Sequence, residues 1–289
     1  MTKYITAELW SRLPKHFHYK GEPNDWVKMT RPGQKLHSFL EGPCFDEHDT
    51  LWLVDVPYGR IFRINDDGKW HQHKNYDGEP HSIKVKDDGS LILTDYKNGL
   101  IEFDAKGKMS VLAEGYKNKP FKGLSDLTIA PNGDLWFTDS GRTSLSDPTG
   151  NVFRYKTDGK LVHILNNVPY PNGIALSPDG KLVYVAATRA NAVWRLMADY
   201  PDKKWPMVGT YVQMSGGLGP DGLAVHDNGN LAVAHAQAGR AYIYNIFGDT
   251  VAQIDLPEGL WITSLIFKEN TLYIVEAQTA SIYIAEILE

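Results

Sequence analysis

The sequence predicts an all-β protein, a six-bladed β-propeller, and three observations support this prediction. A pattern of 15 residues recurs six times, with starts 40 to 49 residues apart. Apolar and polar residues alternate on both sides of a turn in each copy, as in paired strands, and no long segment has helical periodicity. Repeats of this length with three or four short strands are typical of propeller blades. Six regular copies favour a closed ring over a sandwich or an open array.

The six copies differ only slightly in length, and the last one needs a one-residue deletion in its turn. A third strand follows the two strands of each copy, but the final copy reaches the end of the chain without a fourth. We therefore expect an N-terminal strand to complete the last blade and fasten the ring. This divides the single domain into an N-terminal extension (1–35) and the propeller (36–289). Segment 6–13 is expected to be at most a short helix.

The amino-acid composition limits the kinds of molecule that this protein is expected to bind. Apolar residues make up 42% of the chain and charged residues 22%, as in ordinary globular proteins. The net charge of −5 gives no support for nucleic acid or an anionic membrane as partner. The single cysteine, Cys44, excludes an intrachain disulfide and a thiolate metal site. There is no apolar run of signal-peptide or membrane-span length, so we expect a cytoplasmic protein, and the oligomeric state stays open.

Alignment of the copies separates two polar columns. One column is glycine preceded by Asp or Asn, which is the signature of a hairpin turn; it contains Gly89, Gly133, Gly180 and Gly229. The other column stands at the start of each copy, is always polar, and changes its residue type every time. Its members are Glu41, His81, Ser125, Asn172, Asp221 and Thr263.

The first strand of each copy is expected to be the innermost strand of its blade, so the second column forms a polar ring at one mouth of the central channel. The residue after each ring position is mostly small, as a close approach to the axis requires. Glu41, Asn172 and Asp221 supply oxygen donors that suit Ca²⁺. Zinc or copper would prefer imidazole or thiolate, and the ring holds only His81. The alternative interpretation is a solvated polar channel entrance without a metal.

Three residues outside the ring are also singled out. Asp126 follows Ser125 and is either an acid acting through its neighbours or a buried hydrogen-bonding group. Arg142 lies in a segment (141–150) that is long enough to overhang the channel. Trp261 is expected to belong to the core rather than to a substrate platform.

The ordered motifs LEGPCFDEHDTLWLVD, DLTIAPNGDLWFTDSG, YPNGIALSPDG and GPDGLAVHDNG resemble the senescence-marker-protein/gluconolactonase/regucalcin family over about residues 36 to 289. Its members are six-bladed propellers with a divalent metal in the channel, mostly lactonases. The resemblance implies that Glu41, Asn172 and Asp221 ligate this metal. The segment TDSGRTSLSDPTGNVFRY is most similar to the staphylococcal drug-responsive lactonase branch. One departure is Ser125-Asp126, where many gluconolactonases have Asn-Asp.

The polar ring and this resemblance together imply a metal-dependent carboxylic ester hydrolase that opens a lactone ring. Calcium is the expected cation, with zinc, magnesium or manganese as alternatives. Asp221 is our first choice as general base and Asp126 the second. His81, Ser125, Thr263 and Arg142 are expected to bind the substrate. The alternatives are an organophosphate triester hydrolase using the same metal and a propeller that only binds ligands.

Overall fold

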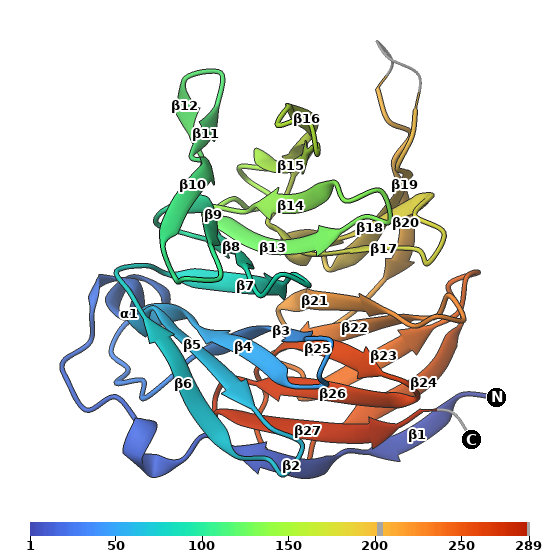
Figure 1. Cartoon of the computed structure of the whole chain (residues 1–289). Helices are drawn as coiled ribbons and strands as arrows, with labels where there is room; N and C mark the ends of the chain where they lie inside the picture. The colour runs from blue at the N-terminus through green and yellow to red at the C-terminus, as the bar shows by residue number, and fades with distance from the viewer. Residues whose placement is uncertain (201–204, 288–289) are drawn as a thin grey trace.

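The computed structural model describes residues 1–200 and 205–287; positions 201–204 and 288–289, which belong to the predicted propeller range 36–289, lie outside them. The described chain folds into six four-stranded antiparallel units arranged around an axis, as predicted, so the protein is a six-bladed β-propeller (Figure 1). In each unit the strands follow one another outward from the axis in chain order, except that the outermost strand of the last blade comes from the N-terminus.

The two inner strands of each blade contain the repeated pattern found in the sequence. The innermost strands are β3 (Leu40–Phe45), β7 (Pro80–Val85), β13 (Leu124–Ile129), β17 (Pro171–Leu176), β21 (Gly219–Val225) and β25 (Ile262–Lys268). Their partners are β4 (Leu51–Asp55), β8 (Leu91–Asp95), β14 (Leu135–Asp139), β18 (Leu182–Ala187), β22 (Leu231–Ala236) and β26 (Thr271–Glu276). Each innermost strand also contacts the innermost strands of the two neighbouring blades, and β25 contacts β3, so these strands form a complete ring.

The outer half of each blade is a second antiparallel pair. The third strands are β5 (Arg60–Ile64), β9 (Gly99–Phe103), β15 (Gly150–Tyr155), β19 (Ala192–Met197), β23 (Arg240–Tyr244) and β27 (Ser281–Glu286). The fourth strands are β6 (Trp70–Asn75), β10 (Met109–Ala113), β16 (Leu161–Val168), β20 (Gly209–Gln213), β24 (Thr250–Asp255) and, from the N-terminus, β2 (Glu8–Arg12).

The N-terminal extension adds strands to two blades. β2 pairs antiparallel with β27 and supplies the fourth strand of the last blade. The expectation of a short helix over 6–13 is therefore wrong, because residues 8–12 of this segment form a strand that pairs with the edge of β27. β1 (Lys3–Thr6) pairs in parallel with β24 as a fifth strand of the neighbouring blade, an addition that the repeat pattern did not predict.

The apolar residues of the strands form cores between neighbouring blades. One cluster joins Leu51 and Leu53 of the first blade to Val275 and Ile282 of the last, and Leu13 packs into it. Comparable clusters lie between the other consecutive blades. Because every blade buries both of its faces in this way, the apolar alternation of the sequence is satisfied all round the ring.

Irregular elements are short. The described helices are α1 (Asp25–Thr30) and the 3₁₀ turns η1 (Lys15–Phe17), η2 (Val56–Tyr58) and η3 (Thr188–Ala190), and a small hairpin is formed by β11 (Gly115–Tyr116) and β12 (Lys119–Pro120). In the part of the chain that the structure describes, no helix has the length and apolar character needed to cross a bilayer.

The four glycines of the turn column all have positive φ, between 68° and 88°, which confirms their assignment to hairpin turns.

Candidate functional site

A β-bulge in every innermost strand presents the polar ring to the channel. Each of these strands shifts its pairing register at the ring position or directly after it, for example between Pro171 and Ile174 in β17 and between Pro220 and Leu223 in β21. Asn172 and Asp221 are therefore left outside the regular ladder. Bulges re-aim side chains and are frequent next to active sites. The sequence showed the polar column but not the bulge that orients it.

Small residues after the ring positions allow the innermost strands to touch. A Cβ placed on Gly173 would lie 2.3 Å from the carbonyl oxygen of Asp221, and one on Gly222 would lie 2.7 Å from the Cα of Ser264. Both contacts are far closer than real Cβ atoms permit. The prediction that these glycines allow close approach rather than a turn is confirmed.

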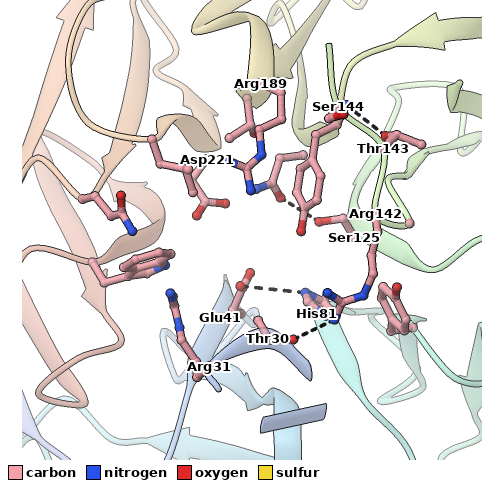
Figure 2. Close-up of a pocket in the computed structure, with 18 of the residues that line it drawn as sticks. Thr30, Arg31, Glu41, His81, Ser125, Arg142, Thr143, Ser144, Arg189 and Asp221 are labelled. Atoms are coloured by element: carbon pink, nitrogen blue, oxygen red, sulfur yellow. Dashed lines mark hydrogen bonds and ion pairs between the residues drawn. The ribbon is translucent and has the colours of Figure 1, made fainter. Parts of the chain in front are cut away.

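The ring opens into a cavity of about 770 Å³ at one end of the channel (Figure 2). Five ring residues line it: Glu41, His81, Ser125, Asn172 and Asp221. Aromatic side chains form much of the remaining wall, namely Trp26, Phe39, Tyr96, Tyr170 and Trp261. Trp261, expected to belong to the core, precedes β25 and is half-buried: it packs against the apolar cluster of Trp26 and Phe39 and also lines this cavity.

Two carboxylates lie buried on the floor of the cavity. Glu41 is 8% exposed and Asp221 is 6% exposed. Burial raises the pKa of both carboxyl groups well above the ordinary range, and the charge of Asp221 raises the pKa of Glu41 further. The Arg31 guanidinium opposes both shifts in part. Such a pair of acids is costly to ionise without a cation beside it.

Asn172 connects the carboxylates to Ser125. The Ser125 hydroxyl donates a hydrogen bond to Asn172 Oδ1 at 2.7 Å, and the Asn172 amide forms a hydrogen bond with the Asp221 carboxylate that opposes the rise in its pKa. The backbone is held as well, because Thr138 Oγ1 of the preceding blade donates to the Asn172 carbonyl at 2.7 Å. The amide oxygen is thus fixed in the same part of the cavity as the carboxylates.

The donor chemistry of this site fits a hard divalent cation. Two buried carboxylates and an amide oxygen are the groups that Ca²⁺ takes, and a cation would offset the unfavourable burial of both acids. Across residues 1–200 and 205–287 there is no cluster of three or more His, Cys, Asp or Glu side chains arranged to hold a metal. The site depends instead on the amide of Asn172, which is not one of those four residue types.

His81 stands beside Glu41 as a neutral imidazole. Its Nδ1 lies 3.8 Å from Glu41 Oε1, and burial lowers the pKa of His81 to about 4. This contact is therefore not an ion pair near neutral pH. The other ring nitrogen, Nε2, is buried with no hydrogen-bond partner among the described residues. A buried polar atom of this kind can serve a ligand that enters the cavity.

Two predicted site residues do not line this cavity. Thr263 is fully buried, and its hydroxyl donates to the Leu40 carbonyl at 2.8 Å in the neighbouring blade. Asp126 accepts the backbone N–H of Ile174 at 2.9 Å and that of Leu127 at 2.8 Å. It lines a second cavity, of about 290 Å³, farther along the innermost strands. Geometry thus gives Thr263 and Asp126 structural contacts rather than contact with a ligand in the main cavity.

The cavity has a roof made of two segments. Residues 24–31, which we call the N-terminal flap, contain α1 and contribute Trp26, Thr30 and Arg31 to the wall. Residues 141–146 cover the cavity from the third blade, as predicted for segment 141–150. Arg142 joins the two, since its guanidinium donates to the Met29 carbonyl at 3.3 Å and to Thr30 Oγ1 at 3.2 Å (Figure 2).

A family model described as the SMP-30/gluconolactonase/LRE-like region matches residues 39–278. The chain belongs to this family. Among curated relatives of this SMP-30/gluconolactonase-like protein is Lactonase drp35 of Staphylococcus epidermidis, 31% identical over 242 residues that make up 80% of this chain and 73% of that protein. Its counterpart in Staphylococcus aureus is 29% identical over 245 residues, with the same two coverages. The resemblance to the staphylococcal lactonase branch is thus confirmed.

Solved structures support the same fold. A gluconolactonase from Xanthomonas campestris superposes with a TM-score of 0.76 at 21% identity, covering 87% of this chain and 86% of that one. Regucalcin, a calcium-binding protein from Agrobacterium tumefaciens, superposes with a TM-score of 0.74 at 23% identity, covering 86% of this chain and 90% of that one. The protein is thus a propeller of a family that includes proteins named as lactonases and gluconolactonases.

Proposed function

We propose that this protein hydrolyses lactones with the help of a divalent cation, calcium, held by Glu41, Asn172 and Asp221. The observation that carries the proposal is the buried pair of carboxylates with an adjoining amide oxygen, placed at the floor of an aromatic cavity. Relatives named as lactonases and the regucalcin fold support it. When bound, the cation would supply Lewis-acid polarisation of the lactone carbonyl.

Asp221 is the residue we assign to proton transfer. Its carboxylate is buried on the floor of the cavity beside the proposed cation, where it can accept a proton from an adjacent water. It takes a proton from the water that attacks the carbonyl carbon and returns that proton to the ring oxygen as the C–O bond breaks. Asp126, the second choice for this role, holds the backbone at Ile174, two residues from Asn172, and thus acts by positioning.

His81 and Ser125 act on the substrate and on the ligand set, respectively. Neutral His81 offers its unpartnered Nε2 to a polar atom of the lactone. Ser125 fixes the orientation of the Asn172 amide through the 2.7 Å hydrogen bond. The aromatic side chains of the cavity wall exclude water from most of the bound lactone ring. Exclusion of water strengthens each polar contact that the lactone makes near Glu41 and Asp221.

The test is a pH-stat assay of γ- and δ-lactones and of one phosphotriester, with calcium and with a chelator. We expect lactone turnover that the chelator abolishes and that Asp221→Asn lowers by about 100-fold or more. Asp87→Asn, an exposed carboxylate in a hairpin turn, is the matched control and should behave as wild type. Lactone turnover that the chelator does not affect contradicts the role of the metal. Turnover of the phosphotriester alone indicates an organophosphate triester hydrolase instead. Turnover of no substrate indicates a propeller that only binds ligands.

A further inference from the structure

The wall of the cavity has more positive than negative side chains. Among the described residues its carboxylates are Glu41 and Asp221, whereas three arginines line it, Arg31, Arg142 and Arg189. A divalent cation bound by the two carboxylates would offset their negative charge. The positive charge of the three arginines would then have no negative counterpart in the cavity. In the described residues, arginines pair with carboxylates at Arg12, Arg60, Arg154 and Arg240, but at none of the cavity positions. Without a cation, Arg31 interacts electrostatically with Glu41 and Asp221, so the excess of positive charge arises once a cation occupies those carboxylates.

Arg31 is the best placed of the three to bind a ligand. Its guanidinium stacks on Trp261, with Cζ 3.2 Å from the ring centroid, and lies 5.1 Å from the Phe39 ring. Stacking orients the guanidinium plane while leaving its N–H edge available for a planar anion. The side chain is half-buried and projects toward the carboxylates (Figure 2). Arg189 lines the opposite wall, over Tyr170 at 5.8 Å.

The flap that carries Arg31 is anchored over the cavity. Trp26 and Val27 are buried against Phe39, Val56 and Ala277 of the first and last blades. Arg142 fastens the C-terminal end of α1 from the other side. The region matched by the family model begins at residue 39, so Arg31 is contributed by a segment outside it. The charge that Arg31 adds to the cavity thus comes from a segment that the family model does not cover.

We propose that the substrate is an anionic lactone, one that bears a carboxylate or phosphate group, and that Arg31 is its specificity-determining residue. This inference rests on the proposed function, in which the ester group of the lactone lies at Asp221 and Asn172. The anionic substituent is then directed toward the flap, where Arg31 receives it as a bidentate partner and Arg189 adds charge from the far wall. Arg142, already engaged with the flap, holds Arg31 in place.

The experiment compares lactones that differ only in charge, using the calcium-loaded full chain. One pair is γ-butyrolactone with a carboxylate beside the ring oxygen and its neutral carboxamide; the other is glucono-δ-lactone phosphate and unphosphorylated glucono-δ-lactone. We expect wild type to prefer an anionic member by about tenfold or more in kcat/KM, mainly through KM. The pair that shows the larger preference identifies carboxylate or phosphate as the group recognised.

Arg31→Gln should cut the anionic-to-neutral ratio of kcat/KM about tenfold, and Arg31→Lys should keep part of it because the charge remains. Lys28→Gln, which removes a positive charge from an exposed position of the same flap, should leave the ratio at the wild-type value. Circular dichroism and thermal melts check that each variant is folded; should Arg31→Gln fail to fold, Arg31→Lys decides the outcome. Equal turnover within both pairs, or a ratio that the Arg31 variants do not change, overturns the inference while leaving lactone hydrolysis intact.

A binding measurement separates this inference from the proposed function. Pyroglutamate is a lactam analogue that is not turned over, and pyroglutamide is its neutral counterpart. Calorimetry should show that wild type binds pyroglutamate more tightly than pyroglutamide and that Arg31→Gln loses the difference. If no lactone is hydrolysed but this Arg31-dependent binding is found, the proposed function fails and anion recognition stands. If the two lactams bind alike, anion recognition fails.

Discussion

Gly173→Ala tests the link between close strand packing and the ligand set. The added Cβ would lie 2.3 Å from the Asp221 carbonyl oxygen and 2.8 Å from the Leu223 nitrogen, whereas ordinary contacts begin at 3.4 Å. The two innermost strands must therefore separate by about 1 Å at this point, a shift typical of an overpacked core that costs about 1–3 kcal/mol. Gly173 does not have positive φ, so backbone strain does not contribute.

This separation acts on two residues assigned to the cation. Asn172 precedes the substituted position, and the clashing atom belongs to Asp221. We expect Gly173→Ala to lower calcium affinity by about 10–100-fold, the range seen when the support of metal ligands is disturbed. Urea unfolding in chelator measures the loss of stability, and calorimetric titration with calcium measures the affinity.

Gly229→Ala is the matched control. Gly229 has a φ of 88° in a hairpin turn, and its added Cβ would meet nothing within 4 Å. The substitution should cost about 1–2 kcal/mol from left-handed backbone strain alone and should not change calcium affinity. Unfolding of Gly173→Ala at the wild-type urea midpoint would contradict the steric clash. A destabilised Gly173→Ala that binds calcium as tightly as Gly229→Ala does would contradict the link between strand packing and the ligand set.

Three further predictions concern the ring. Thr263→Val should lower the free energy of unfolding by about 1–3 kcal/mol, because it leaves a buried carbonyl of β3 without its donor, with no change in lactone KM; a raised KM would restore a substrate role. Ser125→Ala should weaken calcium binding several-fold, measured by calorimetry, because Asn172 loses its 2.7 Å hydrogen bond; unchanged affinity would contradict this. Because the pKa values of Glu41 and Asp221 are raised, the apo fold should lose stability as the pH rises through them, and calcium binding should release protons below them, seen as weaker affinity in more acidic buffers. Affinity that does not change with pH would show that both acids are already ionised.

Much of the architecture follows from patterns that are local in the sequence. Strand alternation and the Asx-Gly turns depend on neighbouring residues, and their repetition at near-constant spacing predicts the number of blades. The polar column is visible for the same reason, since a recurring fold makes any position that varies in residue type stand out. The chain's departure at Ser125 was also apparent, but its contact with Asn172 Oδ1 required the two blades to be placed side by side.

Other features depend on contacts between distant segments. The sequence assigned Thr263 to substrate binding because it shares a column with Asp221, yet the hydroxyl of Thr263 finds the Leu40 carbonyl across the junction of the last and first blades. Trp261 is a large aromatic residue of the kind that usually lies in a core. Only the position of the segment before β25, at the channel mouth, places it beside the cavity. The flap residue Arg31 has no signal in the repeats because it precedes them.

The propeller, its turns and the six ring positions can be predicted from the sequence alone, because periodicity and turn chemistry act over a few residues at a time. Tertiary structure decided which ring residues face the cavity, how the bulges aim them, and which charge the N-terminal flap brings above them. Those properties arise from packing between blades and from a segment folded back over the channel. They depend on distances between residues far apart in the chain, which no local pattern encodes.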